Sequence, residues 1–434
     1  MIGEKAVKNA SWIILCRIVQ ALLGMIISMM TARYLGPSNF GLINYAASIV
    51  AFVIPVMQLG LSNILVHELI EYPAEEGKIL GTSLALSLCS GMCCMVGVTS
   101  FVMIVNAGEK VTIIVCALYS IMLIAQAIEM IQYWYQAKLL SKYTSLVSLT
   151  AYFVVSVYKI FLLASSKEVY WFALSNSIDY FIIGFALLAL YFKLGGQKLQ
   201  FSKGIAKRML SSSKHYIISG LMVTAFLQID KVMLKMMLGD AATGYYSAAV
   251  TCAGMSSFVF TAIIDSLRPV IFEGKKESTA TFEGRVIQLY NIIVYFALLQ
   301  SIIFSVLATP IIHILYGVQY EPAIIILRII VWYTTFSYYG GAKDVWILAE
   351  NQQKYLVLLN ASGAIGNVIL NYFMIKAWGA CGAAVASVIT QVFTNIIMMF
   401  IIKNLRHNNW LLLKALNPVV FFNNLRGFKR LFIK

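Results

Sequence analysis

Charged residues stand inside one of the most apolar parts of the chain. The segment "FLQIDKVMLKMMLGD", residues 226–240, carries Asp230, Lys231 and Lys235 among hydrophobic side chains. A charge at membrane depth costs at least about 2.5 kcal/mol and usually marks a function or a partner. Lys231 and Lys235 are four residues apart, so they share one face of a helix. Reaching for outer headgroups is the alternative for Lys235, and pairing with a cation on another helix is the alternative for Asp230.

Other charged residues fall inside apolar runs or at their ends. The basic ones are Arg17, Arg33, Lys159, Arg328 and Lys343, and the acidic ones, besides Asp230, are Glu129, Asp179 and Asp344. The segment "SNSIDYFIIGF" around Asp179 has no adjacent Lys or Arg to neutralise the carboxylate, although a salt bridge to another helix is an equal alternative.

The most polar of the long runs is "RIIVWYTTFSYYGGAKDVWILAENQQ", residues 328–353. Gly340 and Gly341 predict a weakened or kinked helix just before Lys343 and Asp344. Interrupted helices at membrane depth often border a substrate site. The same run holds four aromatic residues, Trp332, Tyr333, Tyr338 and Tyr339. Helix packing or an aromatic membrane interface is the alternative reason for them.

Composition identifies the elements that position these residues. The chain has 434 residues, of which 60% are hydrophobic and only 12% charged, with a mean hydropathy of +0.82. A soluble domain has about 25% charged residues, so this chain is not one. The net charge of +15 is dispersed between apolar runs, which favours membrane topology over nucleic-acid binding. All seven cysteines lie within apolar runs, without a metal-binding spacing, and indicate neither a metal site nor disulfides.

Runs of about 20 apolar residues predict membrane-spanning helices. The sequence therefore predicts an all-α polytopic membrane protein in which the first span is retained rather than cleaved. Twelve candidate spans are 10–33, 40–66, 79–106, 111–136, 143–164, 169–192, 214–238, 244–267, 286–309, 322–349, 355–375 and 379–402.

Basic residues are unevenly divided between the connecting segments. With the N-terminus inside, the outer segments hold only Arg33, Lys110, Lys167 and Lys376, and most other Lys and Arg residues fall on the inner side. Cytoplasmic loops carry such an excess, so both termini are expected to be cytoplasmic.

Two stretches repeat at an offset of 203 residues. "LGPSNFGLINYAA" at 35–47 and "LGDAATGYYSAAV" at 238–250 share L-G-x-x-x-x-G, and each follows the first span of a six-span half. The glycines suit tight turns that need a positive φ or close backbone approach. We predict four parts: a six-helix bundle at 1–192, a basic cytoplasmic linker at 193–213, a second six-helix bundle at 214–403 and a basic amphipathic tail at 404–434.

Four stretches resemble bacterial polysaccharide flippases, the Wzx-like members of the polysaccharide transport family, which are relatives of the multidrug-and-toxin-extrusion (MATE) exporters in the MOP superfamily. They are "TARYLGPSNFGLINYAASIVAFVIPVMQLGLSNILVHEL", "EMIQYWYQAKLLSKYTS", "LQIDKVMLKMMLGDAATGYYSAA" and "WGACGAAVASVITQ". The resemblance implies a MATE-like fold of two six-helix bundles around a cationic cavity in a bacterial inner membrane. It also implies flipping of polyprenyl-diphosphate-linked oligosaccharide units for O-antigen or capsule synthesis. The two extra C-terminal spans that would favour a lipid II flippase are missing.

That resemblance gives the embedded residues expected roles. Cations would offset the charge of the diphosphate, and the candidates are Arg17, Lys231, Lys343, Lys159, Arg33 and Lys235. Contact with headgroups is the alternative for Arg33 and Lys159. The aromatic residues Trp332, Tyr333, Tyr338 and Tyr339 would face the sugars. The expected partners are the lipid-linked oligosaccharide and membrane lipids, with polysaccharide-assembly proteins as a further option.

Vectorial export needs a driving force, and the sequence has no G-x-x-x-x-G-K-[ST] nucleotide motif. We expect no bound cofactor. We expect transport to be coupled to H⁺ or Na⁺ through Asp179, Asp230, Glu129 or Asp344.

Two other classes compete with a flippase. A multidrug exporter would favour acidic, aromatic cavities, whereas this chain has more basic than acidic residues in its spans. A membrane polymerase or acyltransferase needs a positioned catalytic group, and His313 has no obvious acidic partner in the sequence. A transporter rather than an enzyme is therefore expected.

Overall fold

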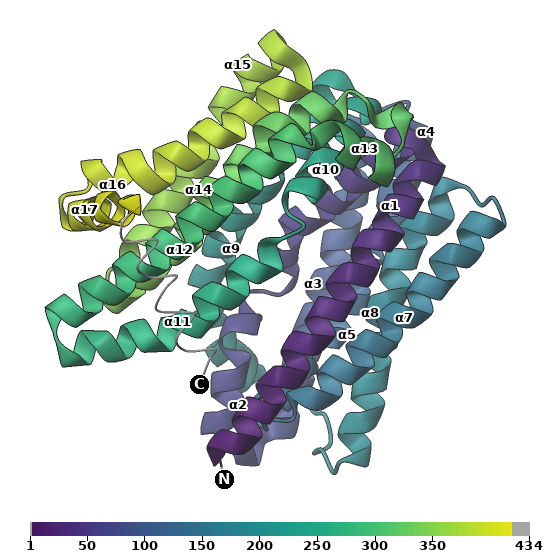
Figure 1. The fold of residues 1–434 in the computed structure, drawn as a ribbon. Coiled ribbons are helices and arrows are strands. Elements are labelled where there is room, and N and C mark those ends of the chain that lie inside the picture. The colour runs from purple at the N-terminus through teal and green to yellow at the C-terminus, as the bar shows by residue number, and fades with distance from the viewer. Residues whose placement is uncertain (1, 419–434) are drawn as a thin grey trace. The chain divides into compact units, whose positions relative to one another are not determined.

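The computed structural model consists of helices joined by turns and loops in the part of the chain that it describes (Figure 1). It describes the backbone of residues 2–418 and the side chains of residues 16 and 18–418. No strand occurs within residues 2–418, which confirms the expected all-α class.

Nine α-helices occupy residues 2–238, together with two short 3-10 helices at Leu61–Asn63 and Pro73–Glu75. The α-helices are α1 (Ile2–Met57), α2 (Leu65–Glu71), α3 (Glu76–Val105), α4 (Lys110–Ser120), α5 (Met122–Glu129), α6 (Gln132–Ala137), α7 (Ser141–Ala164), α8 (Val169–Lys193) and α9 (Lys203–Leu238).

The rest of the described chain continues in the same way. Its helices are α10 (Asp240–Ala253), α11 (Ser257–Glu277), α12 (Thr279–Val306), α13 (Ala308–Leu315), α14 (Ala323–Ala349), α15 (Lys354–Val392), α16 (Met398–Ile401) and α17 (Arg406–Ala415), with a π-helical turn at Phe393–Ile397 between α15 and α16.

The spans agree with the sequence once two kinked helices are divided. Among the described residues, nine helical segments are long and apolar enough to cross a membrane, or ten if α10 and α11, bent by 44°, form one span. The segments Ile18–Met57 and Lys354–Ile401 each contain two of the predicted spans. Each is interrupted by a glycine with non-helical backbone angles, Gly36 or Gly379. With α10 and α11 counted as one span, dividing both segments at these glycines gives twelve spans, the number predicted.

The two glycines of the L-G-x-x-x-x-G repeat adopt the same unusual backbone conformation. Gly36 has φ 72° and ψ 171°, and Gly239 has φ 91° and ψ −172°. This region of backbone space is essentially restricted to glycine. The structure thus confirms that the repeat marks two tight helix-to-helix turns, one within α1 and one between α9 and α10.

The chain folds into two compact units, Met1–Val232 and Met233–Lys434. The boundary falls inside α9, not in the predicted linker at 193–213. That linker packs on the first turns of α3. The backbone N–H of Gln200 donates to the Gly77 carbonyl at 3.1 Å, and the N–H of Ser202 donates to Thr82 Oγ1 at 2.9 Å.

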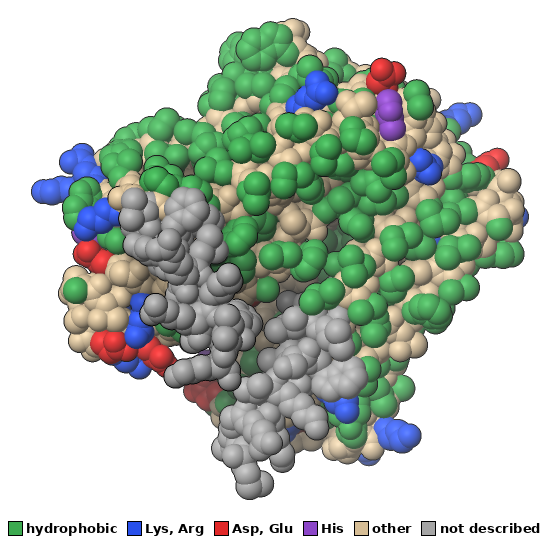
Figure 2. All heavy atoms as spheres, viewed as in Figure 1, with side chains coloured by type: hydrophobic (Ala, Val, Ile, Leu, Met, Phe, Trp, Pro, Cys, Tyr) green, Lys and Arg blue, Asp and Glu red, His purple; other side chains and the backbone are tan. Residues whose placement is uncertain are grey.

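Each unit has its own apolar interior. In unit 1 the buried side chains form one cluster that includes Tyr45, Leu123 and Phe172 and another that includes Leu65 and Tyr135. In unit 2 one such cluster joins α12, α14 and α17. Hydrophobic side chains also cover wide areas of the face shown in Figure 2, where the charged groups lie mostly near the margins. Such a surface is expected of a protein that contacts lipid.

The predicted tail at 404–434 is only partly described. Its first part forms α17, which buries Leu411, Leu412 and Ala415 in the core of unit 2. The opposite side of α17 exposes Trp410, with Lys414 Nζ 3.2 Å from the centre of its ring. The remaining basic residues of the prediction, at 426–434, lie outside the described residues.

Candidate functional site

Lys231 lies on α9 among neutral hydrogen-bonding groups. Its half-buried ammonium donates to Gln228 Oε1 at 3.2 Å. The hydroxyl of Ser48 on α1 is shared between the same oxygen, at 3.1 Å, and the Asn44 carbonyl, at 2.8 Å. The neighbouring Asp230 carboxylate interacts electrostatically with Lys231, whereas the hydrogen bond of the ammonium goes to the neutral amide. Since an ammonium has three donors, this lysine can still bind an anion that approaches it.

Lys235, one turn further along α9, has a different partner. It is 6% exposed, and its Nζ lies 2.8 Å from Oδ1 of Asp240, the first residue of α10. The turn at Gly239 brings the two residues together. In this conformation the Lys235 charge is therefore neutralised within the protein. Asp230, which precedes Lys231, is 8% exposed and also lies within packed structure.

A second polar cluster in unit 1 joins α5, α7 and α8. Lys159 on α7 donates to Asn176 Oδ1 on α8 at 3.0 Å. Asn176 is held by its own bond to the Phe172 carbonyl, at 3.2 Å. Asp179 follows one turn later, and its carboxylate interacts electrostatically with both Lys159 and Glu129.

This cluster brings together three of the residues singled out from the sequence. The Oδ1 atom of Asp179 is buried and has no hydrogen-bond partner among the described residues. Two carboxyl groups beside one ammonium can exchange a proton or hold a monovalent cation. No group of three or more His, Cys, Asp or Glu side chains able to hold a metal ion occurs in the described part of the chain.

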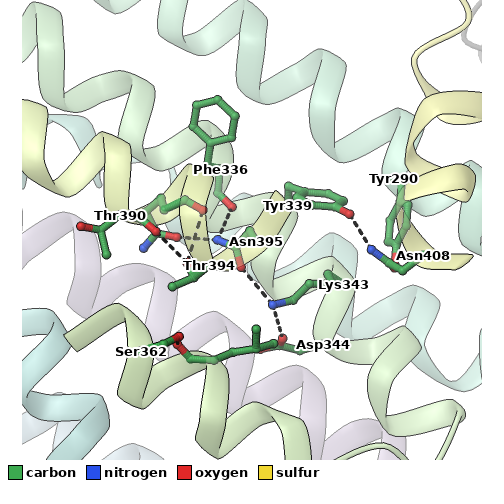
Figure 3. A network of polar contacts seen from close by, with 12 residues as sticks. Tyr290, Phe336, Tyr339, Lys343, Asp344, Ser362, Thr390, Thr394, Asn395 and Asn408 are labelled. Atoms are coloured by element: carbon green, nitrogen blue, oxygen red, sulfur yellow. Dashed lines mark hydrogen bonds and ion pairs between the residues drawn. The ribbon is translucent and has the colours of Figure 1, made fainter. Parts of the chain in front are cut away.

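Lys343 is the most buried of the candidate cations in unit 2, at 3% exposure. Figure 3 shows its ammonium between Asn395 and Asp344. The Nζ atom donates to Asn395 Oδ1 at 3.0 Å and lies 3.4 Å from Asp344 Oδ1. Asn395 in turn donates to Gln391 Oε1 at 2.6 Å and to the Phe336 carbonyl at 3.2 Å. Lys343 thus belongs to a connected network that joins α14 to the π-helical turn.

The predicted kink at Gly340 and Gly341 is wrong. Helix α14 is continuous from Ala323 to Ala349. A Cβ atom on Gly340 would lie 2.8 Å from Asn395 Oδ1, closer than a real side chain allows. Gly340 is therefore needed for the close approach of Asn395, and not for a break in the helix.

The aromatic residues of α14 differ in their surroundings. Tyr339 is 1% exposed, accepts a hydrogen bond from Asn408 at 2.7 Å and packs edge-on against Tyr290. Tyr290 itself donates to Asn408 (Figure 3). Tyr338 stacks on Phe260 at 4.0 Å between ring centres. Trp332 and Tyr333 are half-buried, so part of each ring is accessible from outside the core.

The remaining candidate cations lie on α1, on the N-terminal side of its interruption at Gly36. Arg33 is exposed and precedes the Gly36 turn. The side chain of Arg17 lies outside the described residues.

A polar pocket in unit 1 was not predicted from the sequence. A cavity of about 220 Å³ opens between α1, α6 and α7. Three glutamines line it, Gln20, Gln132 and Gln136, together with serine and threonine hydroxyls such as that of Ser148. The described residues provide no hydrogen-bond partner for these three amides. The i, i+4 spacing of Gln132 and Gln136, which places both amides on one helix face, was the sequence signal that could have indicated this pocket.

The hydrogen-bond partners of the buried charges were also not predicted from the sequence. Gln228 precedes Lys231 by three residues, and Asn176 precedes Asp179 by three, so both shared a helix face with a recognised charge. Asn395 is 52 positions from Lys343, and no local pattern connects them.

Comparisons with known proteins identify a sequence family and a set of similar folds. A family model described as "Polysaccharide biosynthesis protein" matches residues 6–275. No curated protein sequence matches the chain.

Solved structures with a similar fold include the lipid II flippase MurJ in an inward closed conformation, with a TM-score of 0.69 and 13% identity over 97% of this chain and 99% of that one. A multidrug resistance MATE family transporter of the MOP superfamily, in an inward-facing conformation, aligns with a TM-score of 0.63 and 13% identity over 87% of this chain and 92% of that one. A MOP superfamily transporter from Pyrococcus furiosus, reported to have a binding pocket of reverse polarity, aligns with a TM-score of 0.55 and 14% identity over 91% of this chain and 93% of that one. These similarities establish the fold expected from the sequence.

Proposed function

Since this chain belongs to the polysaccharide biosynthesis protein family, we propose that it flips a lipid-linked, anionic oligosaccharide from one leaflet of the membrane to the other. The observation that carries this proposal is Lys231, a cation within a membrane span whose hydrogen-bond partner is a neutral amide. A lysine held at this depth by a neutral group suits a passing anion.

The cargo that fits this site best is a polyprenyl-diphosphate-linked repeat unit. Its diphosphate would otherwise cross the apolar membrane interior uncompensated, at a cost of several kcal/mol. Charge-assisted hydrogen bonds from Lys231 offset part of that cost. Gln228 accepts from both Ser48 and Lys231, which fixes the position of the ammonium. We propose that the repeat units serve O-antigen or capsule synthesis at a bacterial inner membrane.

The sugars require neutral hydrogen-bonding groups, and the polar pocket lined by Gln20, Gln132 and Gln136 supplies amides suited to hydroxyl groups. In unit 2, Trp332 and Tyr333 remain candidates for stacking on sugar rings, whereas Tyr339 is taken up by helix packing. We therefore propose that the sugar contacts include the glutamines of unit 1.

Transport in one direction needs an energy source, and we propose coupling to H⁺ or Na⁺ at the cluster of Glu129, Lys159 and Asp179. The supporting observation is the buried Asp179 Oδ1, which has no hydrogen-bond partner among the described residues. Binding of a cation there would compensate two nearby carboxyl groups. Both termini are proposed to be cytoplasmic, because the segments on that side carry most of the Lys and Arg residues.

Reconstitution tests the proposed function. Liposomes would contain the wild type, Lys231→Gln, Lys231→Arg or Lys376→Gln, and the flipping of a fluorescent polyprenyl-diphosphate oligosaccharide would be followed under a proton or a sodium gradient. We expect Lys231→Gln to flip slowly and Lys231→Arg to retain most of the rate. Lys376 is exposed and bonds to Tyr372, so Lys376→Gln is a control with the same change of charge.

The outcomes separate the rival functions. A wild type that moves no oligosaccharide under either gradient would refute the flippase. If it instead moves a fluorescent organic cation, the protein is a multidrug exporter. Equal flipping rates for the wild type and Lys231→Gln would show that Lys231 does not bind the diphosphate during transport.

A further inference from the structure

An apolar groove runs beside Lys231 in unit 1. A cavity of about 400 Å³ lies between α1, α3 and α9, and every side chain that lines it is hydrophobic. Ile49, Val98 and Val232 form its buried floor, whereas Phe101 at its edge is 44% exposed. The volume is in the range of small-ligand sites.

The groove is open at Gly97. A Cβ atom added to this exposed glycine would meet nothing within 4 Å. Neighbouring residues on α3, among them Val96, are exposed hydrophobics. The opening therefore lies on an apolar surface, where a hydrocarbon chain could enter sideways without meeting water.

The groove and the hydrogen-bonded polar residues occupy adjacent faces of the same two helices. On α9, Gln228 and Lys231 directly precede the lining residues Ile229 and Val232. On α1, Ser48 directly precedes the lining residue Ile49. Since consecutive residues are about 100° apart around a helix, one apolar and one polar stripe run side by side at the same depth.

We propose that this groove holds the polyprenyl chain of the cargo while Lys231 binds its diphosphate. The inference rests on the proposed function, and it identifies which part of the protein recognises the lipid. An ordinary phospholipid is the competing occupant. The polyprenyl chain is favoured because the ammonium beside the groove hydrogen-bonds to a neutral amide and can donate further bonds, which complements a diphosphate headgroup better than a zwitterionic one.

Filling the groove tests the proposal. Gly97→Leu places a side chain in open space, so it obstructs the groove without a clash against the protein. Gly366→Leu is the matched control, because Gly366 also lies within a helix, α15, and its added Cβ would meet nothing within 4 Å. Both variants would be compared with the wild type for flipping of the same oligosaccharide carried on a polyprenyl or on a geranyl diphosphate.

We expect Gly97→Leu to raise the KM for the polyprenyl cargo about tenfold, since a leucine displaces several buried methylene groups of the chain. Its KM for the geranyl cargo should match that of Gly366→Leu. Equal KM values for the polyprenyl cargo in the two variants would overturn the groove assignment.

Photolabelling separates failure of the groove from failure of the flippase. Purified wild type in nanodiscs would be exposed to a polyprenyl diphosphate with a diazirine on the chain. We expect the label on α1 or α3 near Val53, Gly97 or Phe101, reduced about tenfold in Gly97→Leu. A label on other residues would overturn the proposal even if flipping is observed. The proposal would also fail if excess phospholipid prevents the labelling but excess unlabelled polyprenyl diphosphate does not. Labelling in the groove without any flipping would preserve the lipid site and refute the transport function.

Discussion

Lys231 and Lys343 are both lysines within membrane-spanning helices, yet the structure gives them opposite surroundings. Lys231 in unit 1 bonds to one neutral amide oxygen. Lys343 in unit 2 lies between Asn395 and the carboxylate of Asp344, and Asn395 is itself bonded to Gln391 and to the backbone of α14. A position within a membrane-spanning helix therefore does not by itself determine the role of a charge. The partners decide whether a charge remains available to a ligand or is used to join helices.

The strongest effect that we expect is on the stability of unit 2. Lys343→Met would leave Asn395 and Asp344 without their shared cation and should lower the free energy of unfolding by about 2 to 3 kcal/mol. Lys231→Met should lower it by no more than about 1 kcal/mol. Thermal unfolding in the same detergent measures both. Similar losses in the two variants would mean that both lysines serve to join helices.

The second effect concerns transport. Lys231→Gln should reduce flipping of the diphosphate-linked oligosaccharide about thirtyfold, because a charge-assisted bond of about 2 kcal/mol is lost. Lys343→Gln should leave the rate within about threefold when equal amounts of folded protein are reconstituted. The initial rates in liposomes decide this. A deep loss in Lys343→Gln at matched folded protein would make Lys343 part of the passage.

A more modest effect tests why Lys343 is so well held. Gly340→Ala should displace Asn395, whose Oδ1 lies 2.8 Å from the position of the new Cβ, and destabilise the protein by about 1 to 2 kcal/mol. Gly341→Ala is the control, because its Cβ would meet only Ile264 Cδ1, at 3.3 Å. Equal midpoints of thermal unfolding in the two variants would show that the network adjusts freely around Asn395.

The weakest effect belongs to the groups around Lys231. Ser48→Ala removes the hydroxyl that donates to Gln228 and leaves Gln228 less firmly placed. We expect flipping to fall about fivefold, the equivalent of a neutral hydrogen bond of about 1 kcal/mol, with little loss of stability. Initial rates measured in parallel with Lys231→Gln would show how much of the lysine's contribution depends on its position. An unchanged rate would mean that Lys231 needs no positioning.

Much of the fold could be predicted because the relevant signals are local. Apolar runs of sufficient length predicted the spans, and the repeat predicted the glycine turns at Gly36 and Gly239, where only a residue without a side chain tolerates the observed angles. The continuity of α14 through Gly340 was mispredicted, because the need for space beside Asn395 depends on a helix distant in the sequence.

The candidate site was less predictable, because partners on different helices depend on how each helix is rotated. Lys235 and Asp240 are close in sequence, and their ion pair across the Gly239 turn could have been inferred from the turn itself. Asp179 was expected either to be free for coupling or to pair with another helix, and the structure places Lys159 and Glu129 near it. The pocket lined by Gln20, Gln132 and Gln136 joins three helices, and no single segment reveals it.

The packing of residues 197–202 on α3 bears on how the protein is made. Gln200 and Ser202 bond to Gly77 and Thr82, and Gly60 lies against the backbone of Ser213. Unit 1 is therefore completed only after the ribosome has synthesised the first half of α9, well beyond the sixth span. The first six-span half therefore depends on residues that follow it in the chain for its final contacts. A fragment that ended at residue 192 would lack residues 193–232 of unit 1, whereas the remaining fragment would contain all of unit 2.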